Sequence, residues 1–172
     1  SVREAELAML RRVGTSEENM LALQGNLADT YHSTGRLEKA LRMRRDVFSG
    51  FMMSLGDSNE HTIIAALNLS TSLVDSGKCA EARAFMPGQM ALAKRVLGSD
   101  HPLTLDFQWG WARALLKDVD VTAEQLAEAA STLEKALKIA QRVLGHEHPS
   151  TCNYRRYLEY CKIQIARRGV RA

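Results

Sequence analysis

The sequence predicts an all-α protein, an α-solenoid in which antiparallel helix pairs stack side by side. The composition favours helices, because aromatic residues make up only 6% of the 172 residues and Pro occurs three times, while good helix formers dominate. The chain also repeats itself: "RVLGSDHPLT" at residues 95–104 returns as "RVLGHEHPST" at residues 142–151. Internal repetition at a regular interval is the sequence signature of a solenoid, whose units bury their apolar faces against one another.

Glycines that end four similar segments set the length of the repeat. They are Gly14, Gly56, Gly98 and Gly145, so the interval is 42 residues twice and then 47. The five additional residues of the third interval fall near residues 118–122. We therefore divide a single domain, 1–172, into the tail of a preceding helix (1–13), three repeats (14–55, 56–97 and 98–144), and a capping helix with its tail (145–172).

Each repeat is predicted to contain two helices. The first pair spans Glu17–Thr34 and Leu37–Leu55, because Leu23, Leu27 and their apolar neighbours recur at helical spacing and Gly35 suits the left-handed end of a helix. With the partial first helix, about eight helices are expected. The others lie at Glu60–Ser76, Lys78–Leu97, Pro102–Lys117, Thr122–Leu144 and Pro149–Arg168.

The joints between repeats contain helix-start signals. His-Pro opens the helices after His101 and His148, and Glu17 and Asn59 occupy the same position as these histidines in the other repeats. Thr122 with Gln125 forms a capping-box pattern, which marks where the helix restarts after the additional residues.

Small and charged residues at fixed repeat positions predict how the helices pack. Ala40, Ala82 and Ala129 occupy one position and allow a close approach of paired helices. In the last helix, Glu159 and Lys162 stand where the first repeat has an Ala and a Tyr, so we expect this helix to cap the array. Its apolar stripe consists of Tyr154, Leu158, Cys161 and Ile165.

The sequence excludes several classes of function. The net charge of +3 comes from intermixed acids and bases, which does not suit nucleic acid, and no apolar run could span a membrane. Three cysteines without a C-x-x-C pair indicate reduced thiols and a cytoplasmic location. No catalytic motif occurs, and "HEH" at residues 146–148 lacks the spacing and further ligands of a metal site. We expect no enzyme, no cofactor and no metal.

Two segments identify a family. "NLADTYHSTGRLEKAL" (26–41) and "NLSTSLVDSGKCAEA" (68–82), with "LG..HP.T" between units, resemble tetratricopeptide repeats of the long type found in kinesin light chains. The resemblance implies a right-handed superhelix. It also implies a concave groove, lined by the first helix of each pair, that holds an extended peptide.

The same resemblance identifies candidate groove residues. Asn26 and Asn68 match the family's Asn and would clamp a peptide backbone, although a local helix–helix hydrogen bond would explain them equally. Gly110 and Tyr157 replace this Asn in the later units. The candidates also include acids, cations and aromatic anchors, of which Trp109 could instead belong to the core. The full set is Asn26, Asp29, Asn68, Thr71, Asp75, Trp109, Arg113, Lys117, Arg156, Tyr157 and Tyr160.

Two functions remain open at this point. The first is a protein–protein interaction module that recruits an extended peptide or partner protein, in an adaptor, scaffold or cargo-recognition role. The second is a rigid or self-associating repeat segment of a larger signalling or motor protein, with homo-oligomers forming through exposed repeat ends.

Overall fold

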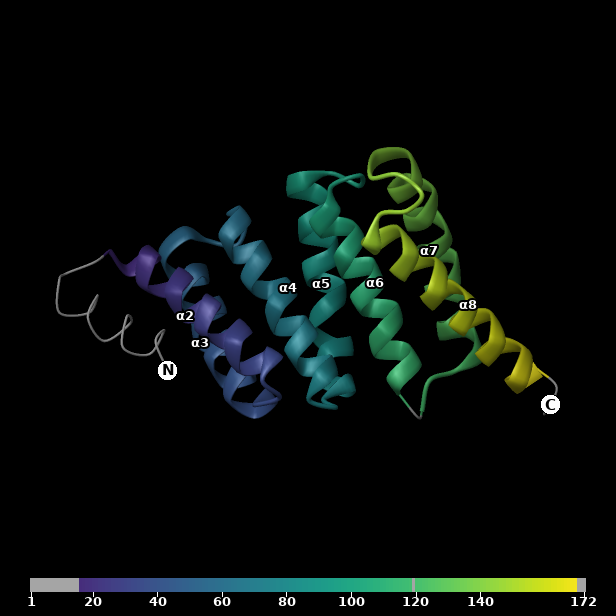
Figure 1. Cartoon of the computed structure of the whole chain (residues 1–172), viewed down its shortest axis with the longest axis horizontal. Helices are drawn as coiled ribbons and strands as arrows, with labels where there is room; N and C mark the ends of the chain where they lie inside the picture. Colours follow the sequence, from purple (N-terminus) through teal and green to yellow (C-terminus); the bar gives the residue numbers. More distant parts are fainter. Residues whose placement is uncertain (1–15, 119, 170–172) are drawn as a thin grey trace. The chain divides into compact units, whose positions relative to one another are not determined.

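The computed structural model describes residues 16–118 and 120–169, and all regular structure in these ranges is α-helical. This confirms the predicted fold class. The predicted helix tail at residues 1–13 and Gly14 lie outside the described residues, as do Val119 and residues 170–172. The seven described helices are α2 Glu17–Ser33, α3 Leu37–Leu55, α4 Glu60–Asp75, α5 Cys79–Leu97, α6 Pro102–Lys117, α7 Ala123–Val143 and α8 Pro149–Gly169 (Figure 1).

Local chemistry at the joints explains why each helix end falls within one residue of its prediction. Asn59, His101 and His148 each accept a hydrogen bond from the backbone N–H two residues later, at 2.9, 3.3 and 3.2 Å. The joint histidines are therefore helix caps. The first repeat differs by one position, because Ser16 caps α2 and Glu17 is already the first helical residue.

The joint glycines take the conformation that the repeat requires. Gly56, Gly98 and Gly145 have φ of 79°, 95° and 94°, a left-handed region that most other residues enter only with strain. These three positions, 42 and then 47 residues apart, thus share the same left-handed backbone conformation.

The described helices form two compact units, which we treat separately. Unit 1 ends at Ser76 and contains α2, α3 and α4; unit 2 begins at Gly77 and contains α5 to α8. The boundary falls inside the predicted second repeat. Within each unit, every helix runs back along the one before it (Figure 1). Ala40, Ala82 and Ala129 are all fully buried, as expected for the small position that lets paired helices approach.

Apolar clusters among the described residues help to hold unit 1 together. One contains Leu27, Tyr31 and Ala40, and the other contains Leu21, Val47, Phe51 and Ala65. Gly50 leaves room for the second cluster, because a Cβ atom at this position would lie 2.5 Å from Leu21 Cδ2 and the Leu21 side chain would have to shift. A glycine on α3 thus allows the Leu21 side chain of α2 to lie directly against the α3 backbone.

Helix α8 has the apolar stripe that its sequence predicts. Tyr154, Leu158 and Cys161 are buried in the core of unit 2, and Ile165 packs at the edge of that core. Glu159 and Lys162 are exposed and form an ion pair with each other at 3.2 Å. In α2 the equivalent positions hold buried residues, whereas Glu159 and Lys162 of α8 face solvent.

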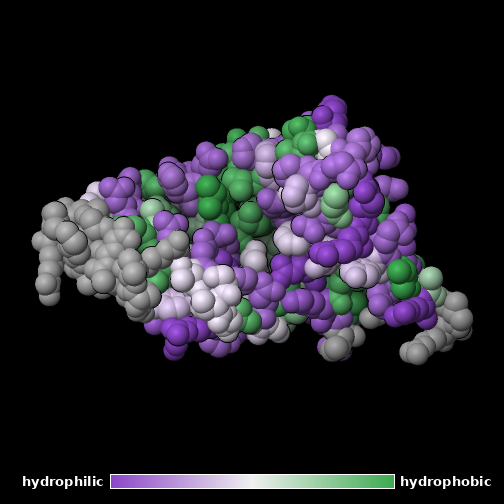
Figure 2. Space-filling model, viewed as in Figure 1, coloured by the Kyte–Doolittle hydropathy of each residue, from purple (hydrophilic) through white to green (hydrophobic). Residues whose placement is uncertain are grey.

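The three cysteines are unpaired thiols. Burial raises the pKa of the Cys161 thiol to about 11, so this group is protonated at neutral pH. No helix in the described ranges is long and apolar enough to cross a bilayer. On the face drawn in Figure 2, hydrophobic residues surface in separate groups between hydrophilic ones.

Candidate functional site

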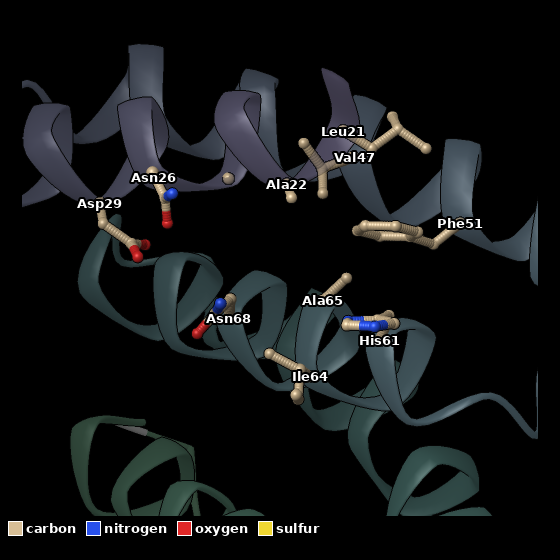
Figure 3. A pocket seen from close by; sticks show the side chains of 11 residues that line it. Leu21, Ala22, Asn26, Asp29, Val47, Phe51, His61, Ile64, Ala65 and Asn68 are labelled. Carbon is tan, nitrogen blue, oxygen red and sulfur yellow. The ribbon is translucent and has the colours of Figure 1, made fainter. Parts of the chain in front are cut away.

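Helices α2, α3 and α4 enclose a cavity of about 240 Å³, which we call the unit 1 cavity (Figure 3). Its buried lining is apolar and consists of Leu21, Val47, Phe51 and Ala65. Its more exposed lining consists of Ala22, Gly25, Asn26, Asp29, His61, Ile64 and Asn68. The predicted residues Asn26, Asp29 and Asn68 therefore line the same cavity, with side chains that project from facing helices.

One end of the unit 1 cavity is an aromatic pair. The His61 ring of α4 stacks on the Phe51 ring of α3, with centroids 5.7 Å apart and planes 19° from parallel. Neither residue was predicted from the sequence. The pair closes this end of the cavity with flat, largely apolar surface.

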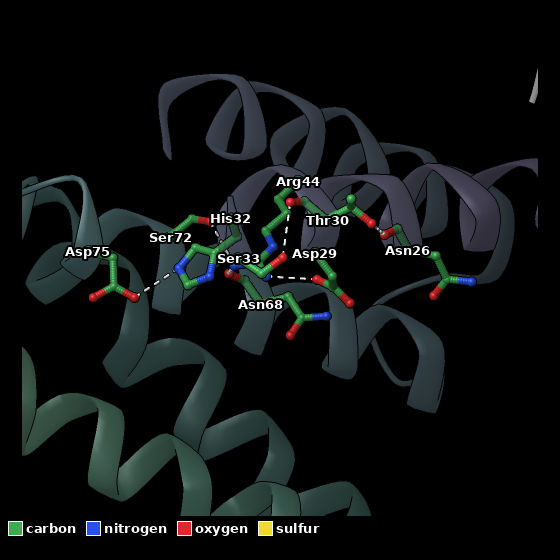
Figure 4. A network of polar contacts seen from close by, with 9 residues as sticks. All are labelled: Asn26, Asp29, Thr30, His32, Ser33, Arg44, Asn68, Ser72 and Asp75. Carbon is green, nitrogen blue, oxygen red and sulfur yellow. Dashed lines mark hydrogen bonds and ion pairs between the residues drawn. The ribbon is translucent and has the colours of Figure 1, made fainter. Parts of the chain in front are cut away.

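A buried arginine joins the three helices of unit 1 at the other end (Figure 4). Arg44 of α3 donates hydrogen bonds to Asp29 Oδ1 at 2.7 Å, to the Asn68 carbonyl oxygen at 2.9 Å and to Ser72 Oγ at 2.7 Å. Its side chain is 7% exposed, whereas that of Asp29 is 51% exposed. The negative charge of Asp29 at the cavity is thus balanced by a fixed guanidinium.

The two predicted asparagines use their main chains within unit 1. The Asn26 carbonyl accepts a hydrogen bond from Thr30 Oγ1 at 3.0 Å, and the Asn68 carbonyl accepts from Arg44. The Asn68 side-chain amide makes no hydrogen bond to another described residue. Since this amide lines the cavity, its two donors and its acceptor are available to a ligand.

Thr71 and Asp75 lie further along α4, outside the lining of the unit 1 cavity. Asp75 Oδ2 is 3.0 Å from Nε2 of His32, so it joins the ends of α4 and α2 (Figure 4). Thr71 is half-buried.

A second pocket lies between α6 and α8 in unit 2. This unit 2 pocket has a volume of about 190 Å³ and is lined by Arg113, Leu116, Lys117, Tyr157, Tyr160 and Gln164. Four predicted residues therefore come together here: Arg113, Lys117, Tyr157 and Tyr160. The lining contains two cations and no carboxylate, which suits a ligand rich in hydrogen-bond acceptors.

Aromatic rings in edge-to-face contact extend along this side of unit 2. Trp109 and Tyr157 meet edge to face with centroids 5.6 Å apart, and Tyr157 and Tyr160 do so at 5.9 Å. The guanidinium of Arg113 lies 5.2 Å from the Trp109 ring centroid, and that of Arg156 lies 5.4 Å from the Tyr157 ring centroid. Such cation–π contacts hold the cations in place beside the pocket.

Trp109 and Arg156 stand beside the unit 2 pocket rather than in its lining. Trp109 is half-buried and packs against the core of unit 2, and its predicted groove role stays a prediction. Its indole N–H is buried and has no hydrogen-bond partner among the described residues. Arg156 is exposed and donates to Asn153 Oδ1 at 3.1 Å.

Asp106 of α6 is turned toward α8. Tyr154 donates a hydrogen bond to Asp106 Oδ1 at 2.8 Å. Burial raises the pKa of Asp106, and this effect is opposed in part by the Tyr154 hydrogen bond and by His148. Burial and the nearby carboxylate together raise the pKa of Tyr154 well above its usual value. The pair stabilises the packing of α8 on α6 and does not line the unit 2 pocket.

Arg44 is the most important residue that the sequence analysis did not identify. The repeat register contained a signal for it, because the equivalent positions hold Met86 and Leu133, both fully buried. A charged residue at a core position of the repeat requires partners in the structure. Comparing the second helices of the repeats, as well as the first, would have identified Arg44.

The same repeat position also lies close to Gly110, which replaces Asn in the third unit. Met86, the counterpart of Arg44, lies so close to α6 that a Cβ atom at Gly110 would be 2.8 Å from Met86 Cε. Any side chain at residue 110 would require Met86 to move. In unit 1, Arg44 instead reaches the main chain of Asn68, and the asparagine side chain remains in the cavity.

The described residues contain no group of three or more His, Cys, Asp or Glu side chains that could hold a metal ion. His146 and His148, the residues considered for a metal, lie at the joint before α8, where His148 caps the helix.

Comparisons with known proteins identify the repeat. A family model for the tetratricopeptide repeat matches residues 62–103 and 122–150. No curated protein matches the sequence.

Solved structures of repeat proteins share the fold. Two structures of the nearly identical TPR-like repeats of a Podosopora anserina protein, described as a kinesin light chain, superpose with TM-scores of 0.75 and 0.73. Both are 24% identical to this chain, and each match covers 96% of this chain and 76% of theirs. BtubC (BKLC) from P. vanneervenii matches with a TM-score of 0.54 and 13% identity, over 96% of this chain and 69% of its own. Residues 62–103 and 122–150 therefore match the tetratricopeptide repeat, and the fold of the chain is similar to that of kinesin-light-chain-like repeat proteins.

Proposed function

We propose that this chain is a protein–protein interaction module that binds extended peptides, or extended segments of partner proteins, with one contact site in each unit: the unit 1 cavity and the unit 2 pocket. Tetratricopeptide repeats generally mediate contacts between proteins. The proposed role is that of an adaptor, scaffold or cargo-recognition segment in the cytoplasm, and it involves binding rather than catalysis.

One observation carries this proposal. Within each unit, side chains predicted to contact a peptide gather around one depression: Asn26, Asp29 and Asn68 in unit 1, and Arg113, Lys117, Tyr157 and Tyr160 in unit 2. The side-chain amide of Asn68 can donate hydrogen bonds to a peptide group and accept one from it, whatever side chain the peptide carries. The cations and rings of unit 2 are of the kind that dominate protein interfaces.

A display library of linear peptides provides a direct test, since it presumes no partner. Peptides selected on the chain would be titrated against two variants, Asn68→Ala in unit 1 and Lys117→Ala in unit 2. The replaced side chains are half-exposed and exposed, respectively. Loss of a contact to a peptide group or carboxylate is expected to weaken binding by about ten-fold. Fluorescence anisotropy of the labelled peptides would measure this loss.

Matched controls come from exposed residues of the second helices, Asp46 on α3 and Glu134 on α7. Asp46→Ala and Glu134→Ala are expected to bind the selected peptides as the unchanged chain does. Peptides that lose affinity on these two substitutions and tolerate Asn68→Ala and Lys117→Ala would contradict the proposal.

Self-association through α8 is a second candidate function. Ile163 is 45% exposed and Tyr160 is 51% exposed, so the outer side of this helix presents apolar surface. If α8 joins two copies, sedimentation equilibrium will show a dimer that Ile163→Glu converts to a monomer. A monomer at all concentrations of the unchanged chain would exclude this candidate.

A further inference from the structure

Gly25 occupies an unusual place in the unit 1 cavity. It lies in the interior of α2, where glycine destabilises a helix relative to alanine. A Cβ atom added to it would meet no described atom within 4 Å, so no close packing requires a glycine here. It does line the unit 1 cavity. The effect of having no side chain at Gly25 is therefore that this part of the cavity stays unfilled.

The other repeats fill the equivalent position. Counting 42, 42 and then 47 residues onward from Gly25 leads to Leu67 on α4, Trp109 on α6 and Arg156 on α8. Each of these is a long side chain, and the first two are apolar and half-buried. Among the described helices, α2 alone has this position without a side chain. The unit 1 cavity therefore lies at the repeat position where α4 and α6 each carry an apolar side chain.

The chemistry of the lining selects what can enter. The buried lining is wholly apolar, from Leu21, Val47, Phe51 and Ala65. At the exposed side lie uncharged amides, and the one carboxylate, Asp29, is already paired with Arg44 at 2.7 Å. A charged ligand group would lose water against this apolar lining, and the carboxylate at its rim already has the Arg44 guanidinium as its partner. An uncharged apolar group would gain by leaving water.

We propose that the unit 1 cavity is a specificity pocket for one aliphatic side chain of leucine size, carried by a bound extended peptide. The ligand's side chain takes the place that Leu67 and Trp109 fill in their own repeats, and the Asn68 amide bonds the peptide group beside it. Gly25 is the specificity-determining residue, because its missing side chain leaves the pocket open. This inference rests on the proposed function and specifies the partner chemistry of one of its two sites.

N-acetyl-leucine N-methylamide is a suitable probe, since it presents one leucine side chain between two peptide groups. Its binding would be followed by NMR shift changes and compared with that of the corresponding serine compound. We expect leucine to bind about ten-fold more tightly than serine, as burial of an aliphatic side chain implies. The shifts should map to Ile64, Ala65 and their neighbours in the cavity. Equal affinity for leucine and serine, or shifts elsewhere, would overturn the proposal.

Filling the pocket is the second arm of the test. Gly25→Leu should abolish binding of the leucine probe, and Gly25→Ala, which adds only a methyl group to open space, should weaken it. The matched control is Gly88→Leu, because Gly88 also lies within a helix with no atom within 4 Å of an added Cβ and lines neither pocket. Gly88→Leu should bind as the unchanged chain does. Circular dichroism would establish that each variant is folded.

Asn68→Ala in the same titration separates the two proposals. If Asn68→Ala weakens binding and Gly25→Leu leaves it unchanged, the side-chain pocket is wrong and the peptide-binding role stands. If neither substitution changes binding, both proposals fail for unit 1. The specificity pocket is supported only when both substitutions weaken binding and Gly88→Leu does not.

Discussion

Arg44 ties the three helices of unit 1 together, because it bonds to α2 and α4 from its place on α3. A guanidinium that is only 7% exposed would be costly without partners. Here a carboxylate, a main-chain carbonyl and a hydroxyl accept hydrogen bonds from its two terminal nitrogens, while its buried Nε has no hydrogen-bond partner among the described residues. The arginine therefore positions both Asp29 and the segment of α4 that presents Asn68.

Replacing Arg44 tests this role. Arg44→Ala should lower the free energy of unfolding by about 2–3 kcal/mol, because it removes several hydrogen bonds and leaves buried acceptors without a donor. Urea unfolding followed by circular dichroism would measure the change. Arg42→Ala, at an exposed position of the same helix, should shift stability by less than about 0.5 kcal/mol. Equal midpoints for the two variants would contradict the role assigned to Arg44.

Two helical glycines of unit 1 should respond in opposite ways to alanine. Gly25→Ala should raise the free energy of unfolding by about 1 kcal/mol, because the new methyl group meets open space and glycine is a poor helix former. Gly50→Ala should lower it, because its Cβ would lie 2.5 Å from Leu21 Cδ2. Thermal unfolding of both variants decides the matter, and a stabilised Gly50→Ala or a destabilised Gly25→Ala would refute the packing described.

At the level of the helices, α7 begins with reciprocal hydrogen bonds. Gln125 N–H donates to Thr122 Oγ1 at 3.2 Å, and Thr122 N–H donates to Gln125 Oε1 at 3.0 Å. This capping box restarts the regular repeat after the additional residues of the third unit. The sequence predicted it because all the necessary atoms lie within four residues.

Removal of this cap should destabilise the chain measurably. Thr122→Ala is expected to cost about 1 kcal/mol of unfolding free energy, as is typical for an N-cap threonine. Ser131→Ala, at an exposed position within α7, serves as the control and should be neutral or slightly stabilising. Chemical unfolding would compare the two, and an unchanged Thr122→Ala would show that the cap contributes nothing to stability.

The contact between α6 and α8 makes a prediction about pH. Because the pKa of Asp106 is raised in the fold, chiefly by burial, the fold favours its protonated form. The stability that Asp106 contributes is therefore largest at acidic pH and declines as pH rises through its folded pKa. Asp106→Asn, which can still accept a hydrogen bond from Tyr154, removes this dependence.

The free energy of unfolding of Asp106→Asn, minus that of the unchanged chain, should thus be larger at pH 7 than at pH 4. Urea unfolding at a series of pH values would measure it. A difference that grows as pH falls would have the wrong sign and would contradict the assignment of burial as the main cause.

For the molecule as a whole, the sequence predicted what depends on local chemistry. Helix ends were predicted closely because left-handed glycines such as Gly98 and caps such as His101 act within a few residues. Ala82 and its equivalents were predicted because close helix packing imposes a small residue at a regular interval.

Side-chain placement between helices was less predictable. The floor of the unit 1 cavity comes from Val47 and Phe51, whose equivalents in the next repeat are Gln89 and Ala93, so the register alone did not indicate a cavity. The edge-to-face contact of Trp109 with Tyr157 depends on rotamers and on the spacing of α6 and α8. These features follow from the packing of residues far apart in the sequence.

The central claim is that the first helices of the repeats present a peptide-binding surface that includes the unit 1 cavity. The most direct measurement is a crystal structure of this chain with a peptide selected from the display library. We predict an extended peptide that hydrogen-bonds through its main chain to the Asn68 amide and places an aliphatic side chain against Phe51 and Ala65. A peptide seated instead on the exposed sides of α3 and α7, with the unit 1 cavity empty, would contradict the account.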